Sequence, residues 1–178
     1  MEIITGHTGA SHIYAADDRA FNAFVYGDGN YVLDSGKLLK AEAVNVNKVR
    51  IYDGELIMQG TKARIRYGEY QDLAIDNGAT GYNRNDLIIA EYTNSSGVES
   101  IDLKVLKGTA TTGTAADPTV TAGDILAGDL SAQMSLFRVR ITGINIAGID
   151  TLYQKIIGGN MLDQSTIDLY NTITGESL

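Results

Sequence analysis

The chain of 178 residues contains no cysteine. This absence excludes disulfide bonds, a cysteine nucleophile, cysteine-ligated zinc and iron–sulfur clusters. A compact fold of this length buries about 70% of the surface that its unfolded chain exposes, and 44% of the residues are hydrophobic. One domain, or one domain with an extension, therefore needs no cross-link or metal to hold it together.

Long apolar runs and basic clusters are also missing. No run of about 18 apolar residues occurs, and the N-terminus lacks the basic-then-apolar pattern of a secretory signal. The net charge is −8, and an acidic surface repels phosphate backbones and anionic lipid heads. The densest basic stretch, Lys62, Arg64 and Arg66, has the spacing of one strand face. We therefore expect neither nucleic acid nor a membrane as a partner.

Proline and tryptophan are scarce, whereas glycine and tyrosine are abundant. One proline and no tryptophan accompany 20 glycines and 10 tyrosines. Glycine without proline is typical of all-β chains with short connections, and tyrosine suits half-exposed sheet faces. The composition predicts a mainly β fold: an antiparallel β-sandwich or barrel-like domain built of hairpins, with a short N-terminal helix and extended arms.

A helical period occurs near the N-terminus. The spacing predicts a helix over residues 15–26, because Phe21, Phe24 and Val25 form one apolar stripe and Gly27 follows as a stop signal.

The segment KVRIYDGELIMQ predicts the first hairpin. Asp53-Gly54 suits a two-residue type I′ turn. Such a turn places the apolar residues before and after it on one face, so turn chemistry and hydrophobic pattern agree. The expected cross-strand pairs are Tyr52 with Glu55, Ile51 with Leu56, and Val49 with Met58.

Further strands and two more hairpins follow. Residues 61–66 and 69–75 predict strands around Tyr67-Gly68. A hairpin is expected around a four-residue loop at 94–97, with Ala90 facing Ile101, and another turns at Thr142-Gly143. The residues expected on the inner faces of these two hairpins are Ile88, Ala90, Tyr92, Ile101, Leu103, Val105, Phe137, Val139, Ile141, Ile144 and Ile146.

Two segments lack a clear period. Residues 108–128 are rich in Thr, Ala and Gly, and we expect a long surface loop that contacts a neighbouring subunit. Residues 150–178 contain a predicted helix near Leu152–Ile157. The expected organisation is an N-terminal arm and short helix (1–30), a β domain (31–149) and a C-terminal extension (150–178).

Both histidines lie just before the predicted helix. His7, His12 and one of Asp17 or Asp18 are the residue types of a facial metal triad. The competing interpretation places both carboxylates in the first turn of the helix, at the positive end of its dipole. The His-x4-His spacing matches neither a helical i, i+4 pair nor a strand i, i+2 pair, so we favour the helix start and predict no metal site.

Other chemical signatures are absent from the sequence. No G-x-S-x-G element, P-loop or G-x-G-x-x-G pattern occurs. The remaining carboxylates are scattered, and Asp53 is explained by its predicted turn. Calcium is the ion that Asp/Asn/Gly loops would favour, although plain turn chemistry accounts for them. We predict no catalytic, cofactor-binding or metal-binding residue, and no enzymatic activity.

Several stretches, in this order, resemble a family of phage and prophage tail or baseplate proteins. They are IITGHTGASHIYAADDRAFNAFVYGDGNYVLDSG, VRIYDGELIMQGTKARI, GYNRNDLIIAEY and LKGTATTGTAADP followed by GDILAGD, over residues 2–147. The resemblance implies a virion component near the distal tail, similar to the N-terminal attachment regions of receptor-binding proteins. It also implies a homo-oligomer, by analogy a trimer, that contacts other tail or baseplate proteins.

The chain lacks the long fibrous or lectin-like C-terminal region of a full receptor-binding protein, so an adaptor or assembly role is expected. The virion is then its location, after synthesis in the bacterial cytoplasm. The alternative is a carbohydrate-binding β module for host-surface adhesion, with Tyr52, Tyr82 or Tyr92 as sugar platforms. A third hypothesis is a metal-dependent enzyme that uses His7, His12 and Asp17.

Overall fold

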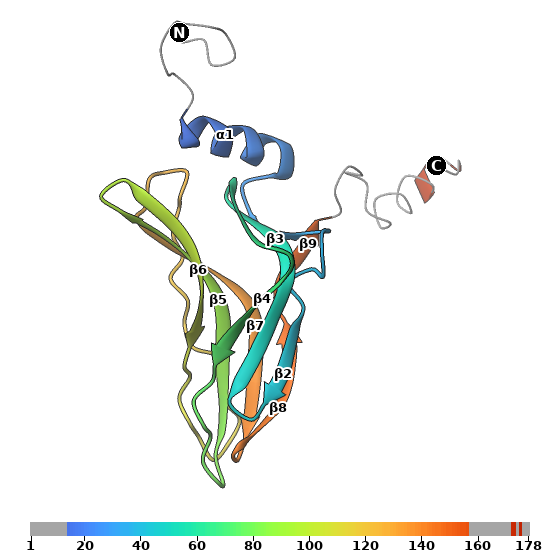
Figure 1. The fold of residues 1–178 in the computed structure, drawn as a ribbon, viewed down its shortest axis with the longest axis vertical. Helices are drawn as coiled ribbons and strands as arrows, with labels where there is room; N and C mark the ends of the chain where they lie inside the picture. The colour runs from blue at the N-terminus through green and yellow to red at the C-terminus, as the bar shows by residue number, and fades with distance from the viewer. Residues whose placement is uncertain (1–13, 157–171, 174, 176–178) are drawn as a thin grey trace, which may run out of the picture.

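The computed structural model of the protein describes residues 14–156, 172–173 and 175. Within this part the chain forms a 12-residue helix and nine strands, so the fold is mainly β, as the composition predicts. The helix lies across one end of the β structure (Figure 1). The elements are α1 (Ala15–Tyr26), β1 (Asn30–Leu33), β2 (Ala41–Asn45), β3 (Lys48–Met58), β4 (Thr61–Ala74), β5 (Asn83–Ser95), β6 (Val98–Leu106), β7 (Ser131–Thr142), β8 (Asn145–Thr151) and β9 (Gln154–Ile156).

The strands form two sheets. In the first sheet, β3 pairs with β4 along one edge and with β1 and β2, placed end to end, along the other. β9 extends this sheet as a parallel neighbour of β1. The second sheet has the order β6-β5-β7-β8 and is antiparallel throughout. Four of the eight connections between successive strands are hairpins: β2–β3, β3–β4, β5–β6 and β7–β8.

One hydrophobic core joins the two sheets. Val32 and Ile51 of the first sheet and Ile88 and Leu136 of the second are fully buried in a single cluster. β2 approaches β8, and β4 approaches β6, so the sandwich curls towards a barrel. The sheets lie close together at the end opposite α1 and diverge towards the helix (Figure 1). No helix in the described part of the chain is long and apolar enough to span a membrane.

The hairpin predicted at Asp53-Gly54 is wrong. β3 runs through both residues, and the chain turns at Gln59-Gly60, where both φ angles are positive (47° and 84°). The prediction rested on the apolar pattern, in which the residues expected to be buried have odd numbers before Asp53-Gly54 and even numbers after it. A β-bulge, at which the pairing with β4 shifts between Tyr52 and Gly54, produces the same change without reversing the chain. The predicted strands 61–66 and 69–75 are the two halves of β4.

The other two predicted hairpins form. β5 and β6 are joined by the two residues Ser96-Gly97, so Ala90 pairs with Leu103 and not with Ile101. This shift of two residues keeps every side chain on its predicted face. β7 and β8 turn at Gly143-Ile144, one residue later than expected, so the prediction of Ile144 on the inner face is wrong: it lies in the turn and is 56% exposed.

The segment predicted as a contact arm lies along its own domain. Residues 107–130 contain no named strand, in agreement with the predicted loop at 108–128. Thr111 forms an isolated bridge to Asn83, and the backbone N–H of Gln133 donates to the carbonyl of Thr121 at 3.0 Å. Ile125 inserts into the core, 4% exposed. These contacts hold the loop on the second sheet.

The helix predicted near Leu152–Ile157 is also wrong. Residues 154–156 form β9 beside β1, and Tyr153 packs edge-on against Phe137 with ring centroids 5.5 Å apart. The Tyr153 hydroxyl donates to the carbonyl of Leu38 at 2.8 Å. A short apolar run is compatible with a helix or with a strand. Here residues 154–156 form a strand because they pair with the open edge of β1.

Candidate functional site

The helix α1 is amphipathic, but its polar side faces the domain. Arg19 Nη1 lies 2.7 Å from Glu99 Oε2 of β6, and Asn22 Nδ2 donates to the carbonyl of Gly60 at 2.9 Å. Gly60 also packs against the backbone of Arg19, where a Cβ would collide with the helix. The helix is therefore tied to the β3–β4 turn and to β6 by polar contacts.

Two of the three residues of the predicted apolar stripe, Phe21 and Phe24, face away from the domain, whereas Val25 is half-buried. The side chains of Phe21 and Phe24, named here the aromatic face of α1, are 67% and 88% exposed. No residue of the helix is buried. A helix of a globular domain normally turns its apolar stripe to the core, so the outward aromatic face is surface that the described part of its own domain does not use.

The start of α1 agrees with the helix-start interpretation. Asp17 Oδ2 accepts a hydrogen bond from the backbone N–H of Tyr14 at 2.8 Å, and Asp18 shares the first turn. His7 and His12 lie outside the described residues. Over residues 14–156, 172–173 and 175, no group of three or more His, Cys, Asp or Glu side chains is placed to hold a metal ion.

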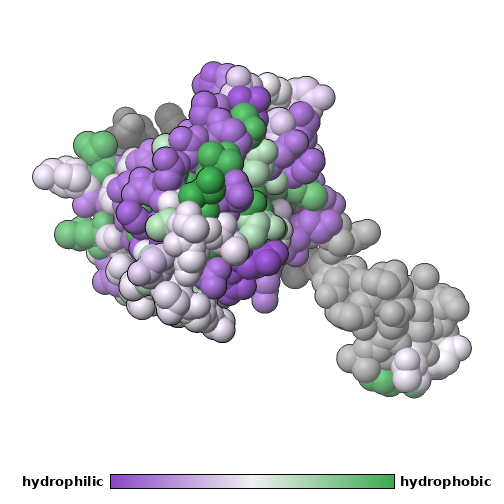
Figure 2. Space-filling view, turned by 90° about the horizontal axis from the view of Figure 1, so that it is seen from below, coloured by the Kyte–Doolittle hydropathy of each residue, from purple (hydrophilic) through white to green (hydrophobic). Residues whose placement is uncertain are grey.

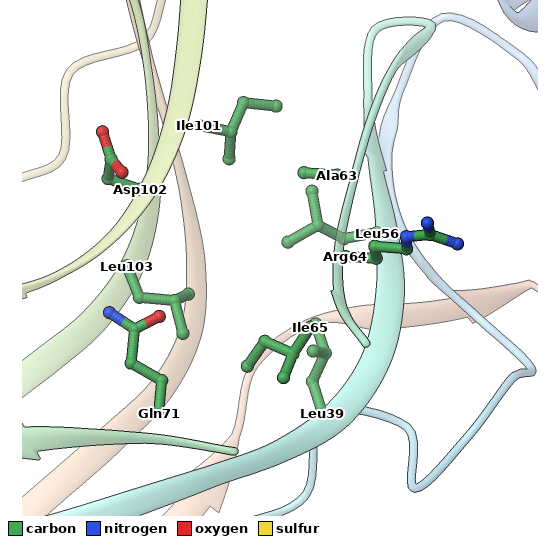
Figure 3. Close-up of a pocket in the computed structure, with 9 residues that line it drawn as sticks. All are labelled: Leu39, Leu56, Ala63, Arg64, Ile65, Gln71, Ile101, Asp102 and Leu103. Atoms are coloured by element: carbon green, nitrogen blue, oxygen red, sulfur yellow. The ribbon is translucent and has the colours of Figure 1, made fainter. Parts of the chain in front are cut away.

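Between the sheets lies a small apolar cleft on the β4/β6 side. Figure 3 shows Ala63 and Ile65 of β4 facing Ile101 and Leu103 of β6 across a cavity of about 70 Å³. All four side chains are half-buried and continue the core towards solvent. The cavity is small compared with ligand pockets, which are typically about 300–1,000 Å³, and Arg64 points away from it.

A larger polar groove lies between the 107–130 segment and the second sheet. Its volume is about 600 Å³, and its lining includes Asn83, Asn85, Asp117, Arg138 and Arg140. Asp117 accepts hydrogen bonds from Arg138 Nε at 2.6 Å and from Asn85 Nδ2 at 2.8 Å. The hydrogen bonds from Arg138 lower the pKa of Asp117. The charged groups at the centre of the groove are thus bonded to one another.

The three tyrosines proposed as sugar platforms lie in different places. Tyr92 is buried, 2% exposed, and its hydroxyl donates to Glu99 at 2.7 Å, so it offers no surface for a sugar. Tyr52 is half-buried under Lys37 and bonded to Glu42. Tyr82 is 45% exposed and adjoins the polar groove through its neighbour in sequence, Asn83.

A buried ion pair occupies the sandwich and was missed by sequence reasoning. Arg84 and Asp86 have side chains 6% and 0% exposed, with Nε and Oδ1 2.8 Å apart. Arg84 also donates to the carbonyl of Asp76 at 2.6 Å, and Asp86 accepts from the backbone N–H of Gly108 at 2.9 Å. The sequence did contain an indication of it, because alternate residues of a strand lie on one face and positions 84 and 86 share the face of the inward-facing Ile88.

Asp53, expected in a turn, is instead buried within β3 at 1% exposure. Its carbonyl accepts hydrogen bonds from the backbone N–H groups of Lys37 and Leu39 at 2.9 and 3.2 Å. Neither carboxyl oxygen has a hydrogen-bond partner among the described residues. The carboxyl is closed off from solvent, so it is not placed to act on a substrate.

Viewed from the end opposite α1, apolar side chains gather near the middle of a mainly hydrophilic surface (Figure 2). The β2–β3 and β7–β8 connections reach this end (Figure 1) and carry Val46 and Ile144, which are 48% and 56% exposed. We name these two residues the opposite-end pair. Lys48 and Arg50 of the neighbouring strand are both bonded to Asp72.

Comparison with known proteins identifies no relative. No family model matches the chain, and no curated protein has significant sequence similarity to it. Functional inference therefore starts from the surfaces described above and from the order of segments in the sequence.

Proposed function

We propose that the protein is a non-enzymatic structural component of a phage or prophage virion, located in the distal tail or baseplate. In this role it assembles with itself and with other tail proteins and helps to attach receptor-binding components. The observation that carries the proposal is the aromatic face of α1. Phe21 and Phe24 are exposed on a helix whose polar side is bonded to the domain, and exposed aromatic side chains of this kind are typical anchors of protein interfaces.

The rest of the fold suits a building block. Two sheets share one core, and the long 107–130 segment is held on its own sheet by Thr111, Thr121 and Ile125. Charged side chains inside the domain and in the polar groove, such as Arg84 with Asp86 and Arg138 with Asp117, are bonded to each other. A rigid domain with one outward aromatic helix favours docking over chemistry.

The test is the composition of purified particles. Prophage induction in the host that encodes the chain, followed by density-gradient purification and quantitative mass spectrometry, should find the chain in intact particles at a fixed ratio to known tail proteins. A bacterial cytoplasmic enzyme serves as the control for contamination. Presence of the chain in the lysate but not in particles would contradict the proposal.

A carbohydrate-binding module is the second candidate, and the polar groove favours it. Asn83, Asn85 and Arg140 line this groove, and amide and guanidinium groups hydrogen-bond sugar hydroxyls. Tyr82 lies beside the groove and is half exposed. Glycan-array binding that is lost in Asn85→Ala and in Tyr82→Ala, but retained when Phe24 is replaced by Ser, would favour this function over the structural one.

A further inference from the structure

The aromatic face of α1 carries negative charge beside it. Asp17 and Asp18 stand in the first turn of the helix, and Arg19, the one basic residue of α1, is engaged by Glu99 of its own domain. The exposed side of the helix therefore presents Phe21 and Phe24 next to two carboxylates that form no ion pair with residues in the described part of the chain. Its natural partner is an apolar surface flanked by basic side chains.

The same chain offers such a surface on β4. Among the described residues, Arg64 and Arg66 form no ion pair, whereas Lys62 on the same strand face is bonded to Glu55 at 2.8 Å. Tyr67 follows at the bulge of β4 and is 91% exposed. We name Arg64, Arg66 and Tyr67 the basic face of β4. Glu69 is the one acid nearby on β4 without a basic partner in this part of the chain.

The opposite-end pair fits the helix less well. Val46 and Ile144 are exposed, but the two cations close to them in the first sheet, Lys48 and Arg50, are both bonded to the one carboxylate of Asp72. An acidic helix gains apolar contact there, but it has to compete with Asp72 for both cations. Both apolar contact and charge pairing are available at β4, where arginine and an aromatic residue stand together.

We infer that the aromatic face of α1 in one copy docks on the basic face of β4 in the next copy. The contact joins two different surfaces, so it is heterologous and repeats from copy to copy. α1 packs on the β3–β4 turn at Gly60, and Arg64 and Arg66 follow four and six residues beyond this turn on β4. Successive copies related by such a contact close into a ring when the rotation between them closes, and they form a filament when it does not. The inference rests on the self-assembly in the proposed function and deepens it by naming the surface on which the aromatic face of α1 docks.

The test uses two variants of the full chain that each lose one face. The helix variant is Phe21→Ser with Phe24→Ser, and the strand variant is Arg64→Glu with Arg66→Glu. Native mass spectrometry should give an oligomer for the unaltered chain and a monomer of about 19.1 kDa for each variant. Circular dichroism and cooperative thermal unfolding confirm that the variants are folded, since all four positions are at the surface.

Mixing the two variants separates this contact from others. The helix variant keeps its β4 face and the strand variant keeps its helix, so the mixture should form a one-to-one heterodimer and nothing larger. A matched control, Val46→Ser with Ile144→Ser, should assemble like the unaltered chain. The inference is overturned if the unaltered chain stays monomeric, if the strand variant still assembles, if the mixture forms no heterodimer, or if the control variant becomes monomeric.

These outcomes are independent of the particle test. A chain that forms the oligomer but is absent from purified particles refutes the virion role and leaves the contact standing. A chain found in particles whose variants do not complement refutes the contact alone.

Discussion

Replacing Gly54 by Ala is expected to destabilise the protein more than replacing a glycine in a tight turn. A Cβ at Gly54 would lie 3.1 Å from Leu39 Cγ and 3.2 Å from the carbonyl carbon of Leu38, and closer still to the backbone nitrogen of Leu39. That nitrogen donates to the carbonyl of Asp53 at 3.2 Å. The obstructing atoms belong mainly to the backbone, so the segment around Leu39 has to move away from β3.

The magnitude follows from two costs. Forcing an extra carbon into a packed region costs about 1–3 kcal/mol, and weakening the backbone hydrogen bond to Leu39 costs about 0.5–1.5 kcal/mol. We expect the free energy of unfolding of Gly54→Ala to fall by about 2–4 kcal/mol. In a domain of this size each kcal/mol lowers Tm by about 2–4 °C.

Gly97 provides the matched control. It has φ of 83° in the β5–β6 turn, and a Cβ there would meet no atom within 4 Å. Gly97→Ala therefore costs only the strain of a left-handed residue, about 1–2 kcal/mol. Urea unfolding followed by circular dichroism compares the two variants. A loss for Gly54→Ala no greater than that for Gly97→Ala would mean that Gly54 stands in a turn and not against Leu39.

Three further predictions concern the polar contacts. Arg84→Ala leaves Asp86 buried and unpaired, so urea unfolding should show a loss of about 3–5 kcal/mol, and Arg84→Met with Asp86→Leu should recover most of it. Arg138 lowers the pKa of Asp117, so the stabilisation from this carboxylate is present above the unfolded pKa of about 3.9 and is lost as the pH falls through the lowered folded value. Asp117→Asn should therefore reduce the loss of Tm between about pH 5 and pH 3. An unchanged pH profile of Tm would contradict the assignment. Tyr92→Phe should cost about 0.5–1.5 kcal/mol, and a neutral result in urea unfolding would mean that its hydroxyl bond to β6 contributes nothing.

Local signals accounted for much of the fold. The helix at 15–26 was recovered with its bounds because its stripe and the stop at Gly27 are both local. The β5–β6 and β7–β8 hairpins were recovered because alternation continues on both sides of a glycine turn. The β5–β6 register differed by two residues, which leaves the inner face unchanged.

The candidate contact surfaces were only half visible in the sequence. The spacing of Phe21 and Phe24 predicts an apolar stripe, but a stripe points to the core in most globular helices. Its outward direction depends on Glu99 and the carbonyl of Gly60, which hold the polar side of α1 from positions far along the chain. The free arginines of β4 likewise become recognisable only once the carboxylates around them are placed.

Composition, turn residues and alternation by themselves determined that the chain is mainly β and where its helix lies. They also determined which side chains of its last two hairpins face inward, except at the turn residue Ile144. These properties depend on neighbours within a few residues. The tertiary structure alone decided that Asp53-Gly54 lies within a continuous strand. A hairpin and a bulge both move the buried positions from odd to even numbers, and only pairing with β4 over the whole length of β3 distinguishes them. The same long-range pairing positions the turn at Gly60 on which α1 rests with its aromatic face outward.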